Sequence, residues 1–419
     1  MSHPSPSALS ELKVIDLTRI LAGPWATQTL ADLGAEVIKI ENPHGGDDTR
    51  NWGPPFVGPD SLDSTQHSAY FCTANRNKKS LTLDFATAEG AELVKVLASQ
   101  SDVFIENFKV GGLSRYGLDY ESLKKINPGL IYCSITGFGQ TGPYADRAGY
   151  DFIIQAMAGL MSVTGQPPDS PGDEPMKIGV ALTDILTGLY ACIGILAAVK
   201  HRDSTGEGQH IDMSLMDVSV AAMANQALNY LVSGQSPQRM GNAHPNIVPY
   251  QVFPTADGHL IITAGNDRQF QSLCNELGEP QLAEDPRYTH NADRVKNRES
   301  LVGAINALTA IQSTSHWIKV LGEAMVPCGP INNMQDVFAD LHVVARGTEI
   351  CLPHGEHSIP GVASPLRLSE TPPVYHNPPP DLGEHTLTIL SEQLGLSDVE
   401  IKKLFEAGIC GQKNQANDE

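Results

Sequence analysis

Apolar runs and helical patterns alternate through the first third of the chain, and this alternation constrains the fold more than any other feature. A short apolar run at 13–17 is followed by the turn residues Gly23 and Pro24, a helical pattern at 25–33 and a second apolar run at 36–40. This order predicts a strand–helix–strand unit.

The alternation continues with predicted strands at 80–83, 103–106 and 130–135 and a predicted helix at 87–99. Strands that alternate with helices form a mostly parallel sheet with helices on both faces. The ligand crevice of such a sheet lies at the carboxyl ends of its strands. We therefore expect an α/β fold with its site among the loops that follow the strands.

The middle of the chain has a different pattern. After a Pro- and Gly-rich loop at 165–175, a long helical pattern at 215–231 precedes a hairpin pattern at 250–263 around Asp257 and Gly258. Helical patterns at 268–277, 298–308 and 315–324 then predict a smaller domain, and a last helix is predicted at 397–407.

Length and charge limit the classes of function. The 419 residues suffice for two or three domains. With 28 basic and 48 acidic residues the formal charge is −20, which argues against a nucleic-acid-coating surface, because such a surface needs clustered Lys and Arg. No nucleic-acid partner is expected, although a few clustered basic residues still suffice for a small anionic ligand.

The cysteines and the apolar segments indicate a soluble protein of a reducing compartment. The 7 cysteines are odd in number and form no CxxC or Cys/His metal pattern. The first twelve residues resemble neither a secretory signal nor a transit peptide. The longest apolar stretch, at 181–199, contains Asp184 and is interpreted as a buried helix. We expect a cytoplasmic location, no membrane partner and no bound metal.

Several familiar catalytic motifs are absent from the sequence. It contains no GxGxxG after the first strand, no GxxxxGK[ST], no GxSxG and no HExxH. These absences argue against a nicotinamide dehydrogenase, a P-loop enzyme and a serine hydrolase of recognisable type.

Basic and amide residues follow several predicted strands. They occur at 75–79, at Asn107, Phe108 and Lys109, and at Arg115. Such a set suits an extended anionic ligand whose ring stacks on Phe108, while charge alone favours the alternative that these residues are solvated loop tips. Asp184, a carboxylate at the start of the most apolar helix, is open to two interpretations: a helix N-cap or a catalytic acid.

Six segments of the chain match the pattern of a known family: LKVIDLTRILAGPWATQTLADLGAEVIKIE (12–41), NRNKKSLTLD (75–84), DVFIENFKVGGLSRYGLDYESLKKINPGLIYCSITGFGQTGPY (102–144), RAGYDFIIQAMAGLM (147–161), ALTDILTGLYA (181–191) and GPINNM (329–334). On these segments the chain resembles the class III CoA-transferases over nearly its whole length, and most closely the succinate-hydroxymethylglutarate type.

The resemblance implies a Rossmann-like large CoA-binding domain built from both ends of the chain, a smaller central α+β domain, and two chains interlocked as a homodimer. On this basis the large domain comprises 1–215 and 346–419, and the small domain 236–326. A linker helix at 216–235 and a second linker at 327–345 connect them.

The resemblance also implies roles for individual residues. Asp184 matches the catalytic aspartate, a nucleophile that forms an anhydride and then a CoA thioester. With a reference pKa of about 3.9 an aspartate is ionised at neutral pH, so it needs no histidine base. CoA is expected as part of the substrate, with no tightly bound cofactor. The implied CoA contacts are Ile20, Leu21, Asn42, Leu83, Asn107, Phe108, Gly112, Arg115, Tyr150 and Asp151, with Arg76, Lys78 and Lys79 as further phosphate contacts.

The expected reaction transfers CoA from an acyl-CoA, such as succinyl-CoA or another dicarboxylyl-CoA, to a carboxylic acid, such as glutarate or a relative. Arg50, His244 and Arg268 are candidates for binding the distal carboxylate. Two alternatives stay open. The first is an alpha-methylacyl-CoA racemase-like isomerase, whose catalytic His would stand at Tyr150, and the second is a non-catalytic CoA-ester-binding protein.

Overall fold

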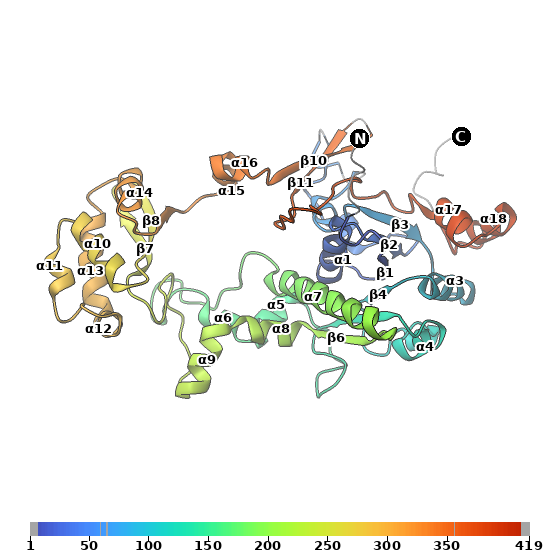
Figure 1. The fold of residues 1–419 in the computed structure, drawn as a ribbon, viewed down its shortest axis with the longest axis horizontal. Helices are drawn as coiled ribbons and strands as arrows, with labels where there is room; N and C mark the ends of the chain where they lie inside the picture. Colours follow the sequence, from blue (N-terminus) through green and yellow to red (C-terminus); the bar gives the residue numbers. More distant parts are fainter. Residues whose placement is uncertain (1–6, 59, 64–65, 356, 412–419) are drawn as a thin grey trace. The chain divides into compact units, whose positions relative to one another are not determined.

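The computed structural model describes residues 7–58, 60–63, 66–355 and 357–411, which form two compact units (Figure 1). Within these ranges the larger unit is built from Met1–Leu160, Ile178–Leu228 and Val344–Glu419, and the smaller unit from Met161–Lys177 and Asn229–Val343. The first and last parts of the chain thus share one unit. The division differs from the sequence-based domains at Met161–Lys177, which belongs to the smaller unit.

A six-stranded parallel sheet forms the centre of the larger unit, as the alternation of strands and helices predicted. Its strand order is β3-β2-β1-β4-β5-β6, with the order reversing between β1 and β4. This is the doubly wound order in which ligands bind at the reversal point. The strands are β1 (Lys13–Asp16), β2 (Glu36–Glu41), β3 (Lys78–Thr82), β4 (Val103–Glu106), β5 (Ile131–Thr136) and β6 (His210–Ser214).

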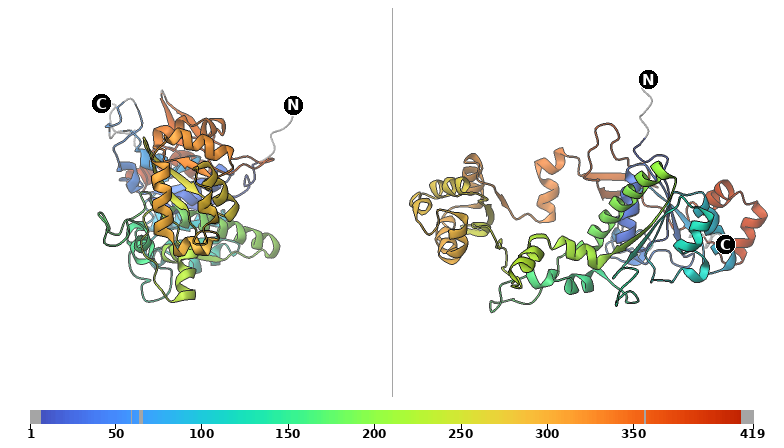
Figure 2. Two further views of the ribbon diagram at one scale, coloured as in Figure 1. Left: turned by 90° about the vertical axis from the view of Figure 1, so that its left-hand side faces the viewer. Right: turned by 60° about the horizontal axis from the view of Figure 1, so that its bottom comes forward.

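Both faces of this sheet are covered, because alternate strand residues point to opposite sides. Val14 belongs to the apolar cluster on one face, with α1 and α7, and Ile15 to the cluster on the other, with α3 and α18. Figure 2 shows helices on both sides of the sheet. The helices of the larger unit are α1 (Ala22–Asp32), α2 (Ala69–Cys72), α3 (Ala88–Ser99), α4 (Tyr120–Ile126), α5 (Asp151–Met157), α7 (Leu182–Thr205) and α8 (Leu215–Ala222), with the short turns η1 (Asp48–Asn51) and η2 (Ser114–Tyr116). Two further helices, α6 (Leu160–Val163) and α9 (Ala224–Ser233), each cross a boundary between the two units in the sequence.

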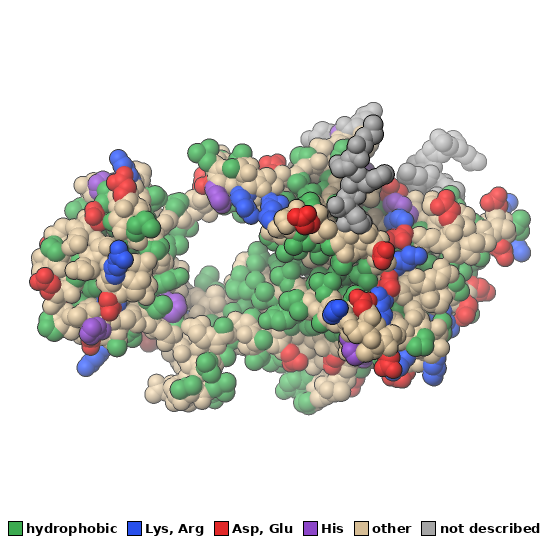
Figure 3. Space-filling view, viewed as in Figure 1, with side chains coloured by type: hydrophobic (Ala, Val, Ile, Leu, Met, Phe, Trp, Pro, Cys, Tyr) green, Lys and Arg blue, Asp and Glu red, His purple; other side chains and the backbone are tan. Residues whose placement is uncertain are grey.

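The longest helix, α7, is buried on one face only. Gly188 allows a close approach to α1, because a Cβ there would lie 2.6 Å from the carbonyl oxygen of Ala22. The opposite face exposes apolar side chains, among them Ile193 at 61%. Figure 3 shows hydrophobic side chains gathered where α7 lies in Figure 1. By length and composition α7 could cross a membrane, yet 39% of its most apolar window is buried inside the protein. The expectation of a fully buried helix is therefore wrong for one face.

A second difference concerns the helical pattern at 215–231. It forms two helices, α8 and α9, rather than one. The break falls at Met223 and Ala224, where Ala224 adopts a positive φ of 44°, a backbone conformation that interrupts a right-handed helix.

The smaller unit contains the predicted hairpin, β7 (Tyr250–Thr255) with β8 (Gly258–Thr263), and a third strand, β9 (Cys328–Pro330). Apolar residues of the sheet and the helices, including Phe253, Phe270 and Trp317, form its core. Its helices are α10 (Asp267–Glu276), α11 (Gln281–Glu284), α12 (Asn291–Lys296), α13 (Arg298–Thr309), α14 (Thr314–Glu323) and α15 (Met334–Ala339), and α16 (Leu341–Ala345) leads back to the larger unit.

The last part of the chain packs on the larger unit. Thr386 accepts a hydrogen bond from the backbone N–H of Thr82 in β3, and Ile401 joins the apolar cluster of α3. This part comprises the hairpin β10 (Glu349–His354) and β11 (His357–Val362), then α17 (Thr386–Thr388), the π-helical turn η3 (Ile389–Gln393) and α18 (Asp398–Glu406).

Candidate active site

A pocket of about 550 Å³ lies in the larger unit at the carboxyl ends of the parallel strands. Its walls come from the loops that follow β1, β2, β3, β4 and β5 and from the starts of α5 and α7. This is the position that the doubly wound strand order predicts. Many of the residues singled out in the sequence line it: Ile20, Leu21, Asn42, Leu83, Asn107, Phe108, Gly112, Arg115, Tyr150, Asp151 and Asp184.

Asn107 ties two of these loops together. Its side-chain oxygen accepts a hydrogen bond of 3.0 Å from the backbone N–H of Arg19, and its amide donates one of 2.8 Å to the carbonyl oxygen of the same residue. The loop after β4 therefore holds the loop after β1 in a fixed position. Asn107 supports the wall of the pocket through these bonds.

A close approach of two backbones shapes another wall. Gly137, after β5, and Gly149, before α5, pack so tightly that a Cβ on Gly137 would lie 2.5 Å from the Cα of Gly149. A larger residue at either position would push the loops apart. The two glycines thus set how near α5 comes to the sheet.

Aromatic rings and cations line the same pocket. Phe108 packs edge-on against Phe85 at 5.6 Å, and the guanidinium of Arg19 lies 5.4 Å from the Phe108 ring centre. Arg115 lies 4.5 Å from the ring centre of Tyr116. Guanidinium groups bind phosphates in bidentate fashion, and aromatic faces stack on flat rings. The wall therefore suits a nucleotide carrying several phosphates.

Asp184 contributes a carboxylate to the pocket from the first turn of α7. The start of α7 is capped by another residue, so Asp184 is not the N-cap that one interpretation of the sequence proposed. Burial, followed by the charge of Asp151, raises its pKa to about 7. Among the described residues no cation pairs with Asp184. The expectation of an ordinary aspartate pKa is therefore corrected.

Asp151, at the start of α5, is the residue that caps α7. One of its oxygens accepts hydrogen bonds from the backbone N–H groups of Thr183 at 2.8 Å and of Asp184 at 3.4 Å, and the other accepts one from Gln155 at 2.6 Å. These bonds hold the Asp151 carboxylate at the N-terminus of α7. They also occupy N–H groups that would otherwise stabilise an anionic Asp184.

The sequence did not point to two further residues near the carboxylates. Tyr70 belongs to α2. Burial of its phenol, followed by the nearby negative charges of Asp184 and Asp151, raises the pKa of Tyr70. Its ring packs edge-on against Trp52 at 5.1 Å. Arg147 lines the pocket and lies 4.6 Å from the ring centre of Tyr144. Arg147 stands in a segment that matches the family, whereas no sequence pattern marks Tyr70.

The other three predicted phosphate contacts lie outside the pocket wall, and their role in binding stays a prediction. Arg76 forms a buried ion pair with Asp32 at 2.6 Å, Lys78 forms one with Asp16 at 3.1 Å, and Lys79 pairs with Glu36 at 2.5 Å. None of these cations lines the pocket. The basic run at 76–79 leads into β3, and carboxylates of β1, β2 and α1 compensate its charges: Asp16 and Asp32 are buried, whereas Glu36 is partly exposed.

The predicted contacts for a distal carboxylate also differ in position. Arg50 binds both oxygens of Glu41, at 2.7 and 2.8 Å, and is not part of the pocket wall. His244 and Arg268 lie in the smaller unit, where the ring of His244 packs against Tyr250 at 5.1 Å. Their role in substrate binding stays a prediction.

Known proteins resemble this chain over most of its length. The model of CoA-transferase family III matches residues 9–386. The succinate–glutarate CoA-transferase of Agrobacterium fabrum is 53% identical over 92% of this chain and 95% of its own. The succinyl-CoA:glutarate CoA-transferase of Homo sapiens is 45% identical over 96% of this chain and 90% of its own.

A solved structure shares the fold. The crystal structure of a CaiB/BaiF family protein from Brucella suis superposes with a TM-score of 0.81 and 52% sequence identity, covering 93% of this chain and 100% of that protein.

Proposed function

This chain belongs to CoA-transferase family III, and we propose that it transfers coenzyme A from succinyl-CoA to a dicarboxylic acid of the glutarate type, with Asp184 as the nucleophile. The observation that carries the proposal is that Asp184 lines the same pocket as Phe108, Arg19 and Arg115. A single cavity thus offers a carboxylate for the chemistry and a basic, aromatic wall for the nucleotide.

The reaction needs only one protein carboxylate. The Asp184 oxygen attacks the thioester carbon, the C–S bond breaks, and CoA leaves as a thiolate, so that a mixed anhydride of Asp184 and succinate remains. The thiolate then attacks the Asp184 carbonyl carbon and releases succinate, which leaves an aspartyl-CoA thioester. The acceptor carboxylate attacks the carbonyl carbon of this thioester, the C–S bond breaks, and the CoA thiolate leaves a second anhydride behind. Return of the thiolate to the acceptor carbonyl completes the new acyl-CoA and restores Asp184.

The raised pKa of Asp184 fits a nucleophile of this kind. Asp184 is poorly solvated, and the negative charge of Asp151 repels its own charge. Forming a neutral covalent bond therefore stabilises Asp184 more than it would stabilise a well-solvated carboxylate. Partial burial also limits the access of water to the anhydrides. Both properties favour transfer to a second acid over hydrolysis.

The transferase proposal is stronger than the two alternatives. An isomerase of the racemase type needs a base where this chain has Tyr150, and a phenol with a reference pKa near 10 is a poor base at neutral pH. A purely binding protein would not need a buried carboxylate beside the nucleotide wall. Relatives with 45–53% identity carry CoA-transferase names.

The test is transfer by the Asp184→Ala variant. With succinyl-CoA and glutarate as substrates, we expect loss of activity by a factor of about 10⁴ or more, since the covalent route is removed, while CoA-ester binding persists. Asp203→Ala, an exposed aspartate near the end of α7, is the matched control. Normal turnover by Asp184→Ala would exclude the mechanism. The isomerase would instead be favoured if the unaltered protein, given an acyl-CoA and no acceptor acid, exchanged the α-hydrogen of the acyl group with solvent deuterium.

We further propose that the protein acts as an interlocked homodimer. The exposed apolar side chains of α7, Leu189, Tyr190, Ile193 and Leu196, support this, because soluble proteins rarely leave such a surface uncovered. A second copy is the occupant that we assign to this surface.

A further inference from the structure

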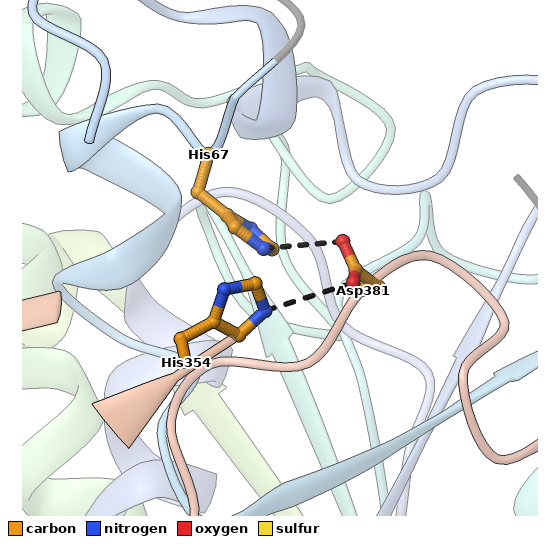
Figure 4. Close-up of side chains that lie close together, drawn as sticks. All are labelled: His67, His354 and Asp381. Atoms are coloured by element: carbon orange, nitrogen blue, oxygen red, sulfur yellow. Dashed lines mark ion pairs between the residues drawn. The ribbon is translucent and has the colours of Figure 1, made fainter. Parts of the chain in front are cut away.

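Two histidines and an aspartate meet in the larger unit, and none of the three lines the pocket. His67 precedes α2, His354 ends β10, and Asp381 lies between β11 and α17 (Figure 4). The three residues are far apart in the sequence, so no spacing motif reveals them. One ligand atom of each lies within 4.8 Å of the ligand atoms of the other two.

The distances within this cluster match those around a small metal ion. Nε2 of His67 lies 3.2 Å from Oδ1 of Asp381, and Nε2 of His354 lies 3.6 Å from Oδ2. Nitrogen and oxygen ligands at roughly 2.0–2.2 Å from a tetrahedral Zn²⁺ lie about 3.4 Å from one another. The two histidine–aspartate separations are thus near those that a tetrahedral ion requires, and the two histidine nitrogens lie within 4.8 Å of each other.

A buried nitrogen provides a second, independent observation. The side chain of His67 is only 9% exposed. Its Nε2 atom is shielded from solvent and forms no hydrogen bond with the geometry that such a bond requires, although it points toward Asp381 (Figure 4). A buried polar atom without a well-aligned hydrogen bond destabilises the folded protein. A metal ion would give this nitrogen a ligand bond in place of its poorly aligned contact with Asp381.

We propose that His67, His354 and Asp381 form a binding site for one divalent transition-metal ion of the Zn²⁺ type. Imidazole nitrogen suits such ions, whereas Mg²⁺ and Ca²⁺ prefer sites built from oxygen ligands alone. The partly exposed Asp381 leaves room for a water molecule as the fourth ligand. The nearby cation Arg50, which donates to the carbonyl of Pro380, is compensated by Glu41.

A metal ion here would fasten three segments of the larger unit to one another. His67 directly precedes the N-cap Ser68 of α2, the helix that carries Tyr70. The ion would therefore hold α2 against the hairpin of β10 and β11 and the segment before α17. This role is structural and does not depend on the proposed transfer reaction.

The test is a Zn²⁺ titration of the full-length, tag-free protein after removal of metal with a chelator, in competition with a chromogenic zinc indicator. We expect one ion per chain, with at least tenfold weaker binding in His67→Gln, His354→Gln and Asp381→Asn. His201→Gln, an exposed histidine in α7, is the matched control and should bind Zn²⁺ as the unaltered protein does. Equal affinity of Asp381→Asn and the unaltered protein would overturn the proposal.

A second measurement needs no variant and so does not depend on their folding. Crystals of the unaltered protein grown with Zn²⁺ are measured on both sides of the zinc absorption edge. An anomalous peak among the three side chains supports the site. Crystals that show no such peak, at a Zn²⁺ concentration above the measured dissociation constant, would refute it.

Discussion

Asp151 Oδ2 lies 3.4 Å from the backbone nitrogen of Asp184, so one carboxylate caps the helix turn that presents the other. This contact has an electrostatic consequence. Burial of the Asp184 carboxyl, followed by the like charge of Asp151, raises the pKa of Asp184 to about 7. The protonation state of the proposed nucleophile therefore changes within the physiological pH range.

The first prediction concerns the pH dependence of transfer. Because only ionised Asp184 attacks, kcat/KM with succinyl-CoA should rise with pH and reach half its plateau near pH 7. Asp151→Asn keeps an oxygen that can accept from Thr183 and removes the repelling charge, so its midpoint should fall by about one pH unit. Rate profiles of both proteins across the pH range give the answer. Identical midpoints would show that Asp151 does not set this pKa.

The second prediction concerns stability. The folded-state pKa of Asp184 lies above its unfolded value, so the folded protein loses stability as pH rises from about 4 through about 7. Asp184→Asn should therefore be more stable than the unaltered protein, by an amount that grows with pH to at most about 4 kcal/mol. Urea unfolding at about pH 5 and about pH 8 measures this. An advantage that does not grow between the two would contradict the raised pKa.

The third prediction concerns Arg115, a cation of the pocket wall. Arg115→Met should raise KM for the CoA ester about tenfold with little change in kcat, because a charge-assisted phosphate contact contributes about 1.5–3 kcal/mol. Steady-state kinetics at low and high salt provide the measurement, and the effect should shrink at high salt. Lys125→Met, on the exposed side of α4, is the matched control. An unchanged KM in Arg115→Met would remove Arg115 from the phosphate site.

The fourth prediction addresses the basic run at 76–79. Arg76→Met leaves the buried carboxylate of Asp32 without its cation, which should cost about 3–5 kcal/mol of folding free energy. The KM of the protein that remains folded should stay the same, since Arg76 is outside the pocket wall. Denaturant unfolding and kinetics of the same preparation distinguish the two effects. A raised KM with normal stability would restore Arg76 as a ligand contact.

The fifth prediction concerns the second copy. Light scattering coupled to size-exclusion chromatography should give twice the mass of one chain. Ile193→Asp, which places a charge on the exposed apolar face of α7, should lower the yield of that species several-fold, whereas Lys200→Asp on the same helix should not. A single-chain mass for the unaltered protein would exclude the homodimer.

Local patterns were enough to predict elements of both units. The strand at 13–17, the helix at 87–99 and the hairpin at 250–263 lie close to where their hydrophobic periods placed them, because burial on one face imposes a period of two or 3.6 residues. The parallel sheet followed from the order of these elements. The resemblance then placed Asp184, Asn107 and Phe108, which line one pocket.

By itself, then, the sequence determined the fold class, the family and the position of the pocket at the strand ends. Only the tertiary structure decided which charged side chains are paired inside the protein and which can contact a ligand. It buries Arg76 and Lys78 against Asp32 and Asp16, sets Asp151 against Asp184, and brings His67, His354 and Asp381 together. The physical reason is that periodicity records which face of an element is buried, whereas charge pairing depends on residues that are distant in the sequence and meet only in the folded chain.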